Sequence, residues 1–264
     1  MNNWCTIVYR TIGVLFCLEA SLYAQALPAQ LICKKDQAQM VLVPGGNFVY
    51  GISKKVRDSL LIALKNAKLP LFELEFDRQT KNLPSYYIDK VEVTNRQYRL
   101  FMKETGRRPP NYWSDPAFNA ADQPVVGVGH ADANAYATWA GKRLPSEEEW
   151  EKAARGTTGR IWPWGNKPSG SVYNGSTQGI NKPVAVGSFP AGASPYGVLD
   201  MAGNVYEMTT GLWSDTSHAI RGGSFLNTGA YARTMFRWAA DDEIKGAVWL
   251  GFRCVADTSI ATEH

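Results

Sequence analysis

The pattern of apolar and polar positions divides the chain into short elements. Met40 to Phe48 reads as two short apolar runs around a Gly-Gly pair, which predicts two strands joined by a turn. Residues 86–93 alternate apolar and polar side chains and predict another strand. Residues 52–84 place leucines at near-helical spacing among Lys and Arg, so an amphipathic helix is expected there, ended by Pro70.

Helix-capping signals mark three further helices. Thr94 is a side-chain cap for NRQYRLFMKET, and Gly106 marks the end of that helix. Residues 132–139 form a second apolar stretch of helical length. Ser146 and Glu149 have the spacing of a capping box, so a third helix begins directly after Ser146.

The composition favours a loop-rich globular fold. The chain has 264 residues, 45% of them hydrophobic, and it contains 9 Trp, 12 Tyr and 24 Gly. Such a chain can bury a core, and its aromatic residues suit irregular spaces better than a helical bundle. After Gly156 the residues Gly, Pro, Asn and Ser dominate, so we expect only short strands there. We find no internal linker and expect residues 27–264 to form a single domain.

The charge argues against a nucleic-acid partner. The formal net charge is +4, from 28 basic and 24 acidic residues. No long Lys/Arg run with interleaved aromatic residues occurs along the sequence, which is the usual footprint of nucleic-acid binding.

The N-terminus is typical of an export signal. Arg10 precedes an apolar run that ends in Ala24-Gln25-Ala26, the pattern of a signal-peptide cleavage site. We therefore expect residues 1–26 to be a signal peptide and the mature protein to be periplasmic or secreted. Glu19 interrupts the run and counts against a stable membrane span, although a retained anchor is the alternative.

The stretch LDMAGNVYE places two acids, Asp200 and Glu207, around a segment that is able to turn. Calcium collects carboxylate and carbonyl oxygens from a bent segment of this kind. A solvated loop would have the same sequence, so the residues alone leave both interpretations open.

Six blocks, in order along the chain, resemble the formylglycine-generating enzyme family, also called the sulfatase-modifying factors. They are YYIDKVEVTNRQYRLF, WAGKRLPSEEEWEKAARG, WPWGN, VGSFPAGASPYGVLDMAGNVYEM, RGGSF and GFRC. The resemblance covers roughly residues 38–257. It implies an α+β, formylglycine-generating-enzyme-like fold related to C-type lectins, loop-rich and with little regular secondary structure. Residues 52–84 are longer than the corresponding link in this family, so this insert either packs on the core or presents a partner surface.

The resemblance also implies calcium sites. In the family, the segment matching LDMAGNVYE binds Ca2+, and the ligands here would be the side chains of Asp200 and Glu207 with the carbonyls of Gly203 and Val205. A second family site is matched only at Asn174 and Gly175, because the acidic loop that would complete it is missing. We therefore expect the first calcium site, and for the second we have only an incomplete match.

The resemblance argues against the family's copper chemistry. Oxidase members hold copper with two cysteines after the RGGS block, and Asn227 and Ala232 occupy those positions here. Neither supplies the thiolate that Cu(I) requires. The iron-dependent sulfoxide synthases of the family use His ligands, but this chain has only three histidines. We interpret His130 and His218 as a loop and a surface residue, and His264 is at the C-terminus.

Two function hypotheses follow from the resemblance. The protein is either an accessory or regulatory member that binds a peptide or protein partner in its groove, or a non-copper enzyme that oxidatively matures a peptide or a peptide-derived small molecule such as a siderophore precursor. We assign no catalytic residue, since Ser224 has no evident His or Asp partner. The candidate groove residues are Ser224, Asn227, Tyr231, Arg233, Arg237 and Trp249. Core packing is the alternative for Tyr231 and Trp249, and a structural ion pair for Arg237.

Cysteine usage leaves one candidate disulfide. Removal of residues 1–26 leaves only Cys33 and Cys254, and two cysteines in an exported chain predict a bond. Family members that pair the cysteine matching Cys254 use a partner in the helix of residues 134–139, which has no cysteine here. Two separate buried thiols are the alternative.

Overall fold

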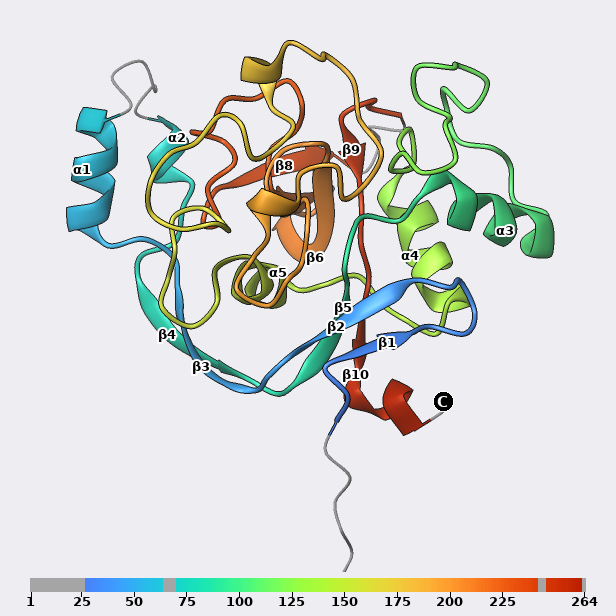
Figure 1. The fold of residues 1–264 in the computed structure, drawn as a ribbon, viewed down its shortest axis with the longest axis horizontal. Coiled ribbons are helices and arrows are strands. Elements are labelled where there is room, and N and C mark those ends of the chain that lie inside the picture. Colours follow the sequence, from blue (N-terminus) through green and yellow to red (C-terminus); the bar gives the residue numbers. More distant parts are fainter. Residues whose placement is uncertain (1–26, 64–69, 242–245, 263–264) are drawn as a thin grey trace, which may run out of the picture.

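The computed structural model describes residues 27–63, 70–241 and 246–262 (Figure 1). The predicted signal peptide lies outside this range. The helices are α1 (Lys54–Ala63), α2 (Pro70–Glu73), α3 (Asn95–Thr105), α4 (His130–Trp139) and α5 (Glu147–Arg155), with short 3-10 turns at Ser176–Gln178, Pro190–Gly192 and Thr258–Thr262. Within the described part of the chain, no helix has the length and apolar character needed to cross a membrane.

The strands form three small sheets. They are β1 (Gln30–Ile32), β2 (Gln39–Val43), β3 (Gly46–Tyr50), β4 (Gln79–Leu83), β5 (Tyr86–Asp89), β6 (Tyr206–Ser214), β7 (Ser217–Arg221), β8 (Arg237–Asp241), β9 (Leu250–Gly251) and β10 (Val255–Asp257). One sheet has the order β1-β2-β5-β10, a second pairs β3 with β4, and the third has the order β8-β7-β6-β9. Among the strand pairs of the described residues, β6–β9 is parallel and the others are antiparallel. This mixed, loop-rich architecture is the α+β fold that the sequence predicts.

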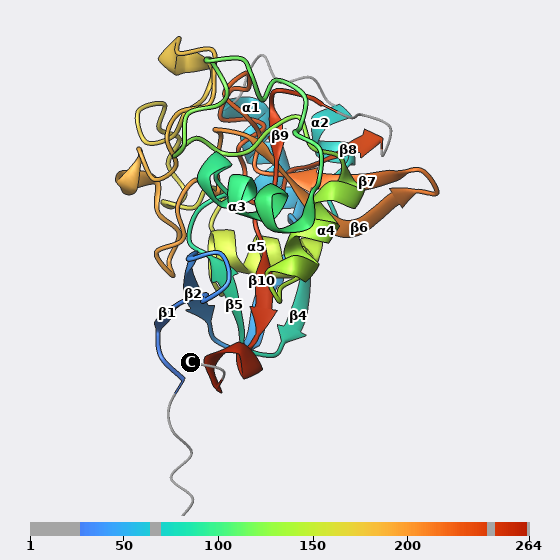
Figure 2. The ribbon, with the colours of Figure 1, turned by 90° about the vertical axis from the view of Figure 1, so that its right-hand side faces the viewer.

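The two strands predicted on either side of the Gly-Gly pair do not pair with each other. β2 and β3 flank the Gly-Gly pair, but β2 pairs with β1 and β5, whereas β3 pairs with β4. The glycines therefore carry the chain from one sheet to another and do not close a hairpin. The expectation of only short strands after Gly156 is also wrong for β6, which has nine residues and forms with β7 the hairpin that projects in Figure 2.

The predicted helix caps of α3 and α5 are confirmed. Thr94 accepts a hydrogen bond from the backbone of Gln97 in a capping box, and Gly106 ends α3 in the left-handed conformation, with φ of 70°. Ser146 and Glu149 form the second capping box, at the start of α5. In contrast, α4 begins at His130, two residues before the start that the sequence indicates.

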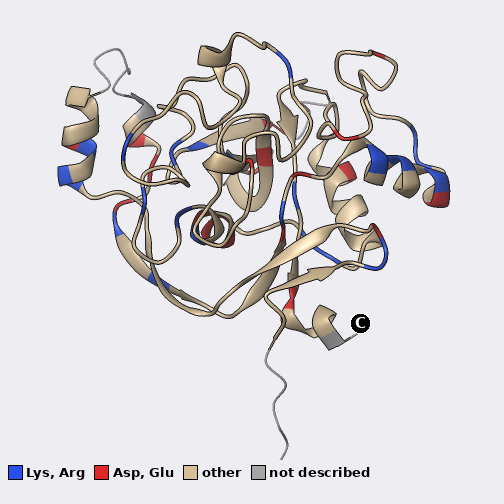
Figure 3. Cartoon of the chain, in the orientation of Figure 1, with Lys and Arg blue, Asp and Glu red and all other residues tan. Residues whose placement is uncertain are grey.

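The insert folds back on the domain. α1 and α2 lie together at one edge of the molecule in Figure 1, and Figure 3 shows that α1 presents several Lys and Arg residues. Leu60 and Phe72 are buried in the largest hydrophobic cluster, together with Tyr98 and Tyr136 of α3 and α4. Leu61 packs against the same cluster, while Leu64 lies outside the described residues. Of the two alternatives for the insert, packing on the core is therefore the one observed.

Helix α5 occupies the centre of the fold and connects the sheets. Its Trp150 is fully buried against Val41, Ile88 and Met201. Arg221 at the end of β7 is also fully buried and forms ion pairs with Glu147 and Glu151 of α5. This contact fixes the start of the RGGS segment to the core, and the loop that follows carries the candidate groove residues.

Candidate functional site

The RGGS loop is held by hydrogen bonds within itself. The amide oxygen of Asn227 accepts one hydrogen bond from the backbone N–H of Ser224 (2.9 Å) and another from its hydroxyl (2.8 Å). Ser224 is 1% exposed. Because an amide oxygen cannot take up the hydroxyl proton as a base would, this arrangement does not activate Ser224 as a nucleophile.

The two positions that match the copper cysteines do not fit copper(I). Asn227 offers an amide whose oxygen is already bonded to Ser224, and Ala232 is buried in a cluster with Tyr173 and Ala202. Copper(I) needs soft sulfur ligands. The two thiols in the described residues lie in other clusters, Cys33 beside Met40 and Cys254 in the main core. No reaction step is therefore assigned to copper.

Both candidate arginines make ion pairs in the fold. Arg233 lies 2.8 Å from Glu75 of the insert, and both side chains are fully buried. Arg237 binds Glu147 through two contacts of 2.8 and 2.6 Å. The structural alternative for Arg237 is therefore confirmed.

The aromatic candidates pack against the core. Tyr231 meets Phe236 edge to face at 5.3 Å, and Trp249 meets Tyr206 in the same way at 5.7 Å. Both are partly buried against the main cluster, which confirms the packing alternative for them. The structure thus uses Tyr231, Arg233, Arg237 and Trp249 for packing and ion pairing.

Beside the RGGS loop is a cavity of about 240 Å³, which we call the aromatic cavity. Two of its lining rings, Trp162 and Tyr173, stack on Trp164, with ring centroids 6.2 and 5.6 Å from it. Trp162 donates a hydrogen bond from Nε1 to the carbonyl of Gly229, at 2.8 Å. The lining residues are Trp162, Pro168, Ser169, Gly170, Tyr173, Thr177, Thr228, Gly229 and Ala230. No Asp, Glu, His, Lys or Arg belongs to this lining, so the cavity suits binding better than proton transfer.

The sequence analysis missed this cavity. Its signal was present in WPWGN and in Tyr173, but the rings come from one loop and the floor, Thr228–Ala230, from another. These three floor residues lie between the two positions where oxidase members carry their copper cysteines.

The candidate calcium segment forms a tight turn. Asp200, Gly203 and Asn204 all have positive φ, at 56°, 75° and 58°. Asp200 Oδ2 accepts a hydrogen bond from the backbone of Gly187, at 2.5 Å. At Gly203 a Cβ would collide with the backbone of Asn174, so only glycine fits that close approach. The turn therefore supplies the bent, oxygen-rich backbone that the sequence predicts.

The Glu207 carboxylate is already paired. Its oxygens lie 2.6 and 2.7 Å from nitrogens of Arg253, and Trp150 donates a further hydrogen bond at 2.7 Å. Among the described residues, no set of three or more Asp, Glu, His or Cys side chains is arranged as a metal site. Calcium bound at this turn would share the Glu207 carboxylate with the guanidinium of Arg253. The calcium site stays a prediction.

Glu92 is an acid of this region that the sequence analysis overlooked. It is fully buried and binds Asn204 through Oε1 at 3.0 Å, while Oε2 has no hydrogen-bond partner among the described residues. Burial first, and then the charge of Asp200, raises the pKa of Glu92 well above its usual value. Burial likewise raises the pKa of Asp200. Two carboxyls with raised pKa values are an environment in which a bound cation would be stabilising.

The second calcium candidate lies next to the first. Asn174 donates to Asn204 Oδ1 (3.1 Å) and to the carbonyl of Lys182 (3.0 Å), and its own Oδ1 has no partner within the described part of the chain. Gly175 begins a 3-10 turn whose Ser176 N–H donates to Asn227, so this segment joins the calcium turn to the RGGS loop.

The two described histidines are not the loop and surface residues that the sequence indicated. His130 is the first residue of α4 and His218 lies in β7, and their rings stack with centroids 3.5 Å apart. His130 contacts the carbonyl of Thr209 (3.1 Å) and the side chain of Asn134 (3.0 Å) through its two ring nitrogens. His264 lies outside the described residues.

The predicted Cys33–Cys254 disulfide is not present in the structure. Both cysteines are free and buried, and Cys33 Sγ donates to the carbonyl of Ala140 at 3.6 Å. Burial raises the pKa of both thiols. Nearby, Lys142 forms buried ion pairs of 2.7 Å with Asp36 and Asp89. These ion pairs connect the N-terminal segment, through Asp36, with β5 and with the segment after α4.

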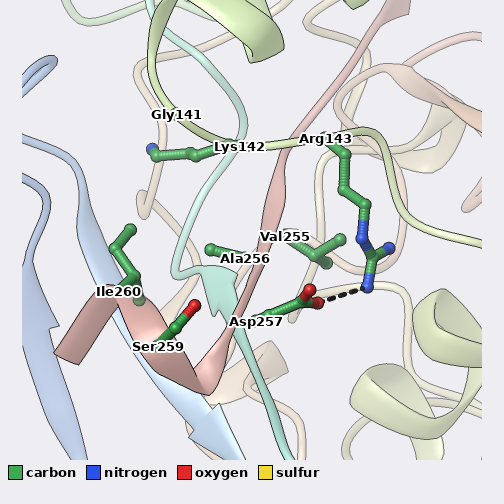
Figure 4. A pocket seen from close by; sticks show the side chains of 8 residues that line it. All are labelled: Gly141, Lys142, Arg143, Val255, Ala256, Asp257, Ser259 and Ile260. Carbon is green, nitrogen blue, oxygen red and sulfur yellow. Dashed lines mark hydrogen bonds and ion pairs between the residues drawn. The ribbon is translucent and has the colours of Figure 1, made fainter. Parts of the chain in front are cut away.

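A cavity of about 210 Å³ at the β10 edge is shown in Figure 4. Arg143 and Asp257 form an ion pair of 3.1 Å at one side of it. It is lined by Gly141, Lys142, Arg143, Val255, Ala256, Asp257, Ser259 and Ile260, none of which belongs to the RGGS loop. The main charged groups of this cavity already have partners, so the aromatic cavity is the better ligand site.

With this geometry, the chain matches the sulfatase-modifying factor enzyme 1-like domain over residues 26–258. The chain belongs to this family. It is similar to the hercynine oxygenase of Mycolicibacterium smegmatis, with 30% identity over 274 residues that cover 82% of this chain and 61% of the relative. It is also 30% identical to the formylglycine-generating enzyme of Thermomonospora curvata over 256 residues, 68% of this chain and 84% of that enzyme.

Other similarities place limits on what can be transferred. The protein YfmG of Bacillus subtilis is 32% identical over 231 residues, which cover 71% of this chain and 45% of YfmG. The chain thus spans about half the length of the first curated relatives, from 45% to 61%. Among solved structures, PvdO from Pseudomonas aeruginosa has a TM-score of 0.70 and 24% identity, covering 86% of this chain and 97% of PvdO. At that identity the likeness shows the fold alone.

Proposed function

We propose that this protein is an exported family member that does not carry out copper-dependent oxidation and binds a peptide or protein partner at the RGGS loop. The aromatic cavity is the observation that supports this proposal. Its floor, Thr228–Ala230, lies between the two positions at which oxidase members use cysteines. Stacked aromatic walls suit an apolar or aromatic side chain of a peptide.

The chemistry of the loop supports binding over catalysis. The Ser224 hydroxyl donates a hydrogen bond to the side-chain amide of Asn227, and Arg233 and Arg237 form ion pairs. A peptide-modifying enzyme needs an acid, a base, a nucleophile or a redox group beside the bound substrate. The lining of the aromatic cavity contains hydroxyls, rings and backbone carbonyls, which orient a ligand well but transfer protons poorly at neutral pH.

Peptide display tests the binding proposal. We expect peptides selected on the wild-type protein from a random seven-residue library to be enriched in aromatic residues. They should lose binding to Gly229→Leu, because the new side chain enters the cavity. Gly229→Ala is the matched control, since its Cβ would lie no closer than 3.4 Å to Tyr173 and leaves most of the cavity open. Peptides that bind all three proteins equally, or no enrichment at all, would place the partner elsewhere.

A reaction assay separates the proposal from the enzymatic alternatives. Wild-type protein supplied with copper and a CxPxR peptide should leave the peptide mass unchanged. Conversion of the peptide thiol to an aldehyde would overturn the argument from Asn227 and Ala232. A mass change in a display-selected peptide without copper would instead favour the non-copper enzyme.

A further inference from the structure

The two ends of the insert meet at a single point of the domain. Ile52 forms an isolated bridge with Asp77. The Ile52 N–H donates to the carbonyl of Phe76, and the Arg78 N–H donates to the carbonyl of Ile52, both at 2.9 Å. Residues 53–76 are therefore an excursion whose two ends are hydrogen-bonded to each other, and a short link can replace it without separating β3 from β4.

The second half of this excursion contacts the two arginines that follow the RGGS loop. The ring of Phe72 lies 4.0 Å from the guanidinium carbon of Arg233, and Glu75 forms an ion pair with the same guanidinium. The ring of Phe76 lies 4.2 Å from the guanidinium of Arg237. The segment Phe72–Phe76, Phe-Glu-Leu-Glu-Phe, thus places two rings and one carboxylate against two guanidinium groups. These belong to Arg233 and Arg237, far along the chain.

The receiving surface is itself aromatic. Trp213 lies 4.5 Å from the Arg237 guanidinium, and Phe236 lies 5.9 Å from that of Arg233. We call Trp213, Arg233, Phe236 and Arg237 the arginine surface. Arginine between aromatic rings binds carboxylates and further rings well, because the guanidinium combines a charge, a flat face and several donors.

The fit of the Glu75 side chain to this surface is incomplete. Both Glu75 oxygens and both terminal nitrogens of Arg233 lack an aligned hydrogen bond within the described residues, although the nearest pair is 2.8 Å apart. Native proteins usually satisfy buried charged groups fully. A cavity of about 300 Å³ also lies between the insert and the rest of the domain, with Val56 of α1 and Met235 among its lining residues. Leu60 and Phe72 thus pack on the core, whereas the contact of Glu75 with Arg233 is left without aligned hydrogen bonds.

We propose that the arginine surface is a recognition site for peptides in which a carboxylate is flanked by aromatic side chains, and that Phe72–Phe76 occupies it as an internal ligand. This inference shares with the proposed function the idea of a peptide partner, but uses different residues from the aromatic cavity. An external segment of the same chemistry would compete with the internal one, and the insert would leave the surface when the partner binds.

A shortened protein, with residues 53–76 replaced by a Gly-Ser-Gly link, provides the test. Fluorescence anisotropy at pH 8 would measure the binding of two labelled peptides. One copies Pro70–Arg78. The other, Trp-Asp-Val-Asp-Tyr, has different residues but keeps the order aromatic, acidic, aliphatic, acidic, aromatic. We expect both to bind the shortened protein. For a peptide that binds the shortened protein with a Kd of about 10 μM, the wild type should bind about 100-fold more weakly, because the tethered segment competes at a millimolar effective concentration.

Three controls identify the surface. In the shortened protein the arginines should be open to water, so the burial that raises the pKa of Glu75 in the wild type is reduced there. A peptide with Asn in place of Asp should then bind about tenfold more weakly, since it cannot form charged hydrogen bonds with arginine. Arg233→Gln in the shortened protein should weaken the binding of the acidic peptides by the same factor. Gly229→Leu should leave their binding unchanged, so failure of the aromatic cavity proposal and failure of this one are distinguishable.

The proposal is overturned by any of three results. If only the Pro70–Arg78 copy binds, the segment is a complementing piece of the fold and not a stand-in for a partner. If the acidic and amide peptides bind equally, the arginines do not recognise the carboxylate. If near-ultraviolet circular dichroism shows that the shortened protein has lost its tertiary structure, the insert is part of the core.

Discussion

Glu207 and Arg253 form a buried ion pair in which Oε2 lies 2.6 Å from Nε and Oε1 lies 2.7 Å from Nη2. Both side chains are fully buried. Arg253 also donates to the carbonyls of Asp89 and Leu199, at 3.1 and 2.9 Å. The pair therefore joins the strand after the calcium turn to the GFRC segment and to β5.

Breaking this pair should be strongly destabilising. Glu207→Gln leaves the Arg253 charge buried without its partner, and removal of one member of a buried pair costs about 3–5 kcal/mol. We expect a loss of this size in the free energy of unfolding, measured by urea denaturation. The matched control is Arg96→Ala, which removes an exposed pair of 2.7 Å with Asp122. Exposed pairs contribute less than about 1 kcal/mol.

A second pair of variants checks that the effect belongs to the ion pair. Glu207→Leu combined with Arg253→Met replaces both charges with apolar groups, which is often tolerated where single removals are not. The double variant should be more stable than the sum of the two single effects predicts. Additive losses would mean that the two residues contribute independently.

The sequence predicted the structural features that depend on residues close together in the chain. Thr94 and Ser146 cap their helices through side chains that reach only three positions along the chain, so the capping boxes could be recognised directly. The Glu75–Arg233 pair joins residues far apart in the sequence and depends on where an insert settles. Nothing in either local pattern specifies the other partner, so such a contact could not be predicted.

The same distinction applies to the candidate site. The motif LDMAGNVYE indicated a turn with oxygen ligands, and positive φ at Asp200 and Gly203 confirms the turn. The contact of Glu92 with Asn204 joins the segment after β5 to a turn more than a hundred residues later. Glu92 lies in the first family block, but nothing in that block indicates that its side chain meets the calcium turn, which is why it was missed.

Calcium removal should lower the stability of the wild-type protein. If Ca2+ binds at the turn, a chelator leaves Asp200 and Glu92 buried without a cation, and the melting temperature should fall. Asp200→Ala removes a ligand, so the same chelator should scarcely change its melting temperature. Differential scanning fluorimetry with and without EDTA measures both. A chelator effect of equal size on the two proteins would place the calcium elsewhere or nowhere.

Titration of Glu75 should make stability depend on pH. Burial, the largest cause, raises the pKa of Glu75 from 4.5 to about 7, and the charge of Arg233 opposes this only in part. The folded protein therefore binds the Glu75 proton more tightly than the unfolded chain does. Its contribution to stability is fully present below pH 4.5 and is lost as the pH rises through about 7.

The measurement compares wild type with Glu75→Gln, which has no proton to bind at this position. The difference between their free energies of unfolding should move against the wild type by at most about 3 kcal/mol between pH 4.5 and pH 8. Subtracting the variant removes the titration of the groups that both proteins share. A difference that stays constant, or that grows in favour of the wild type as the pH rises, would mean that the charge of Arg233 outweighs the effect of burial on Glu75.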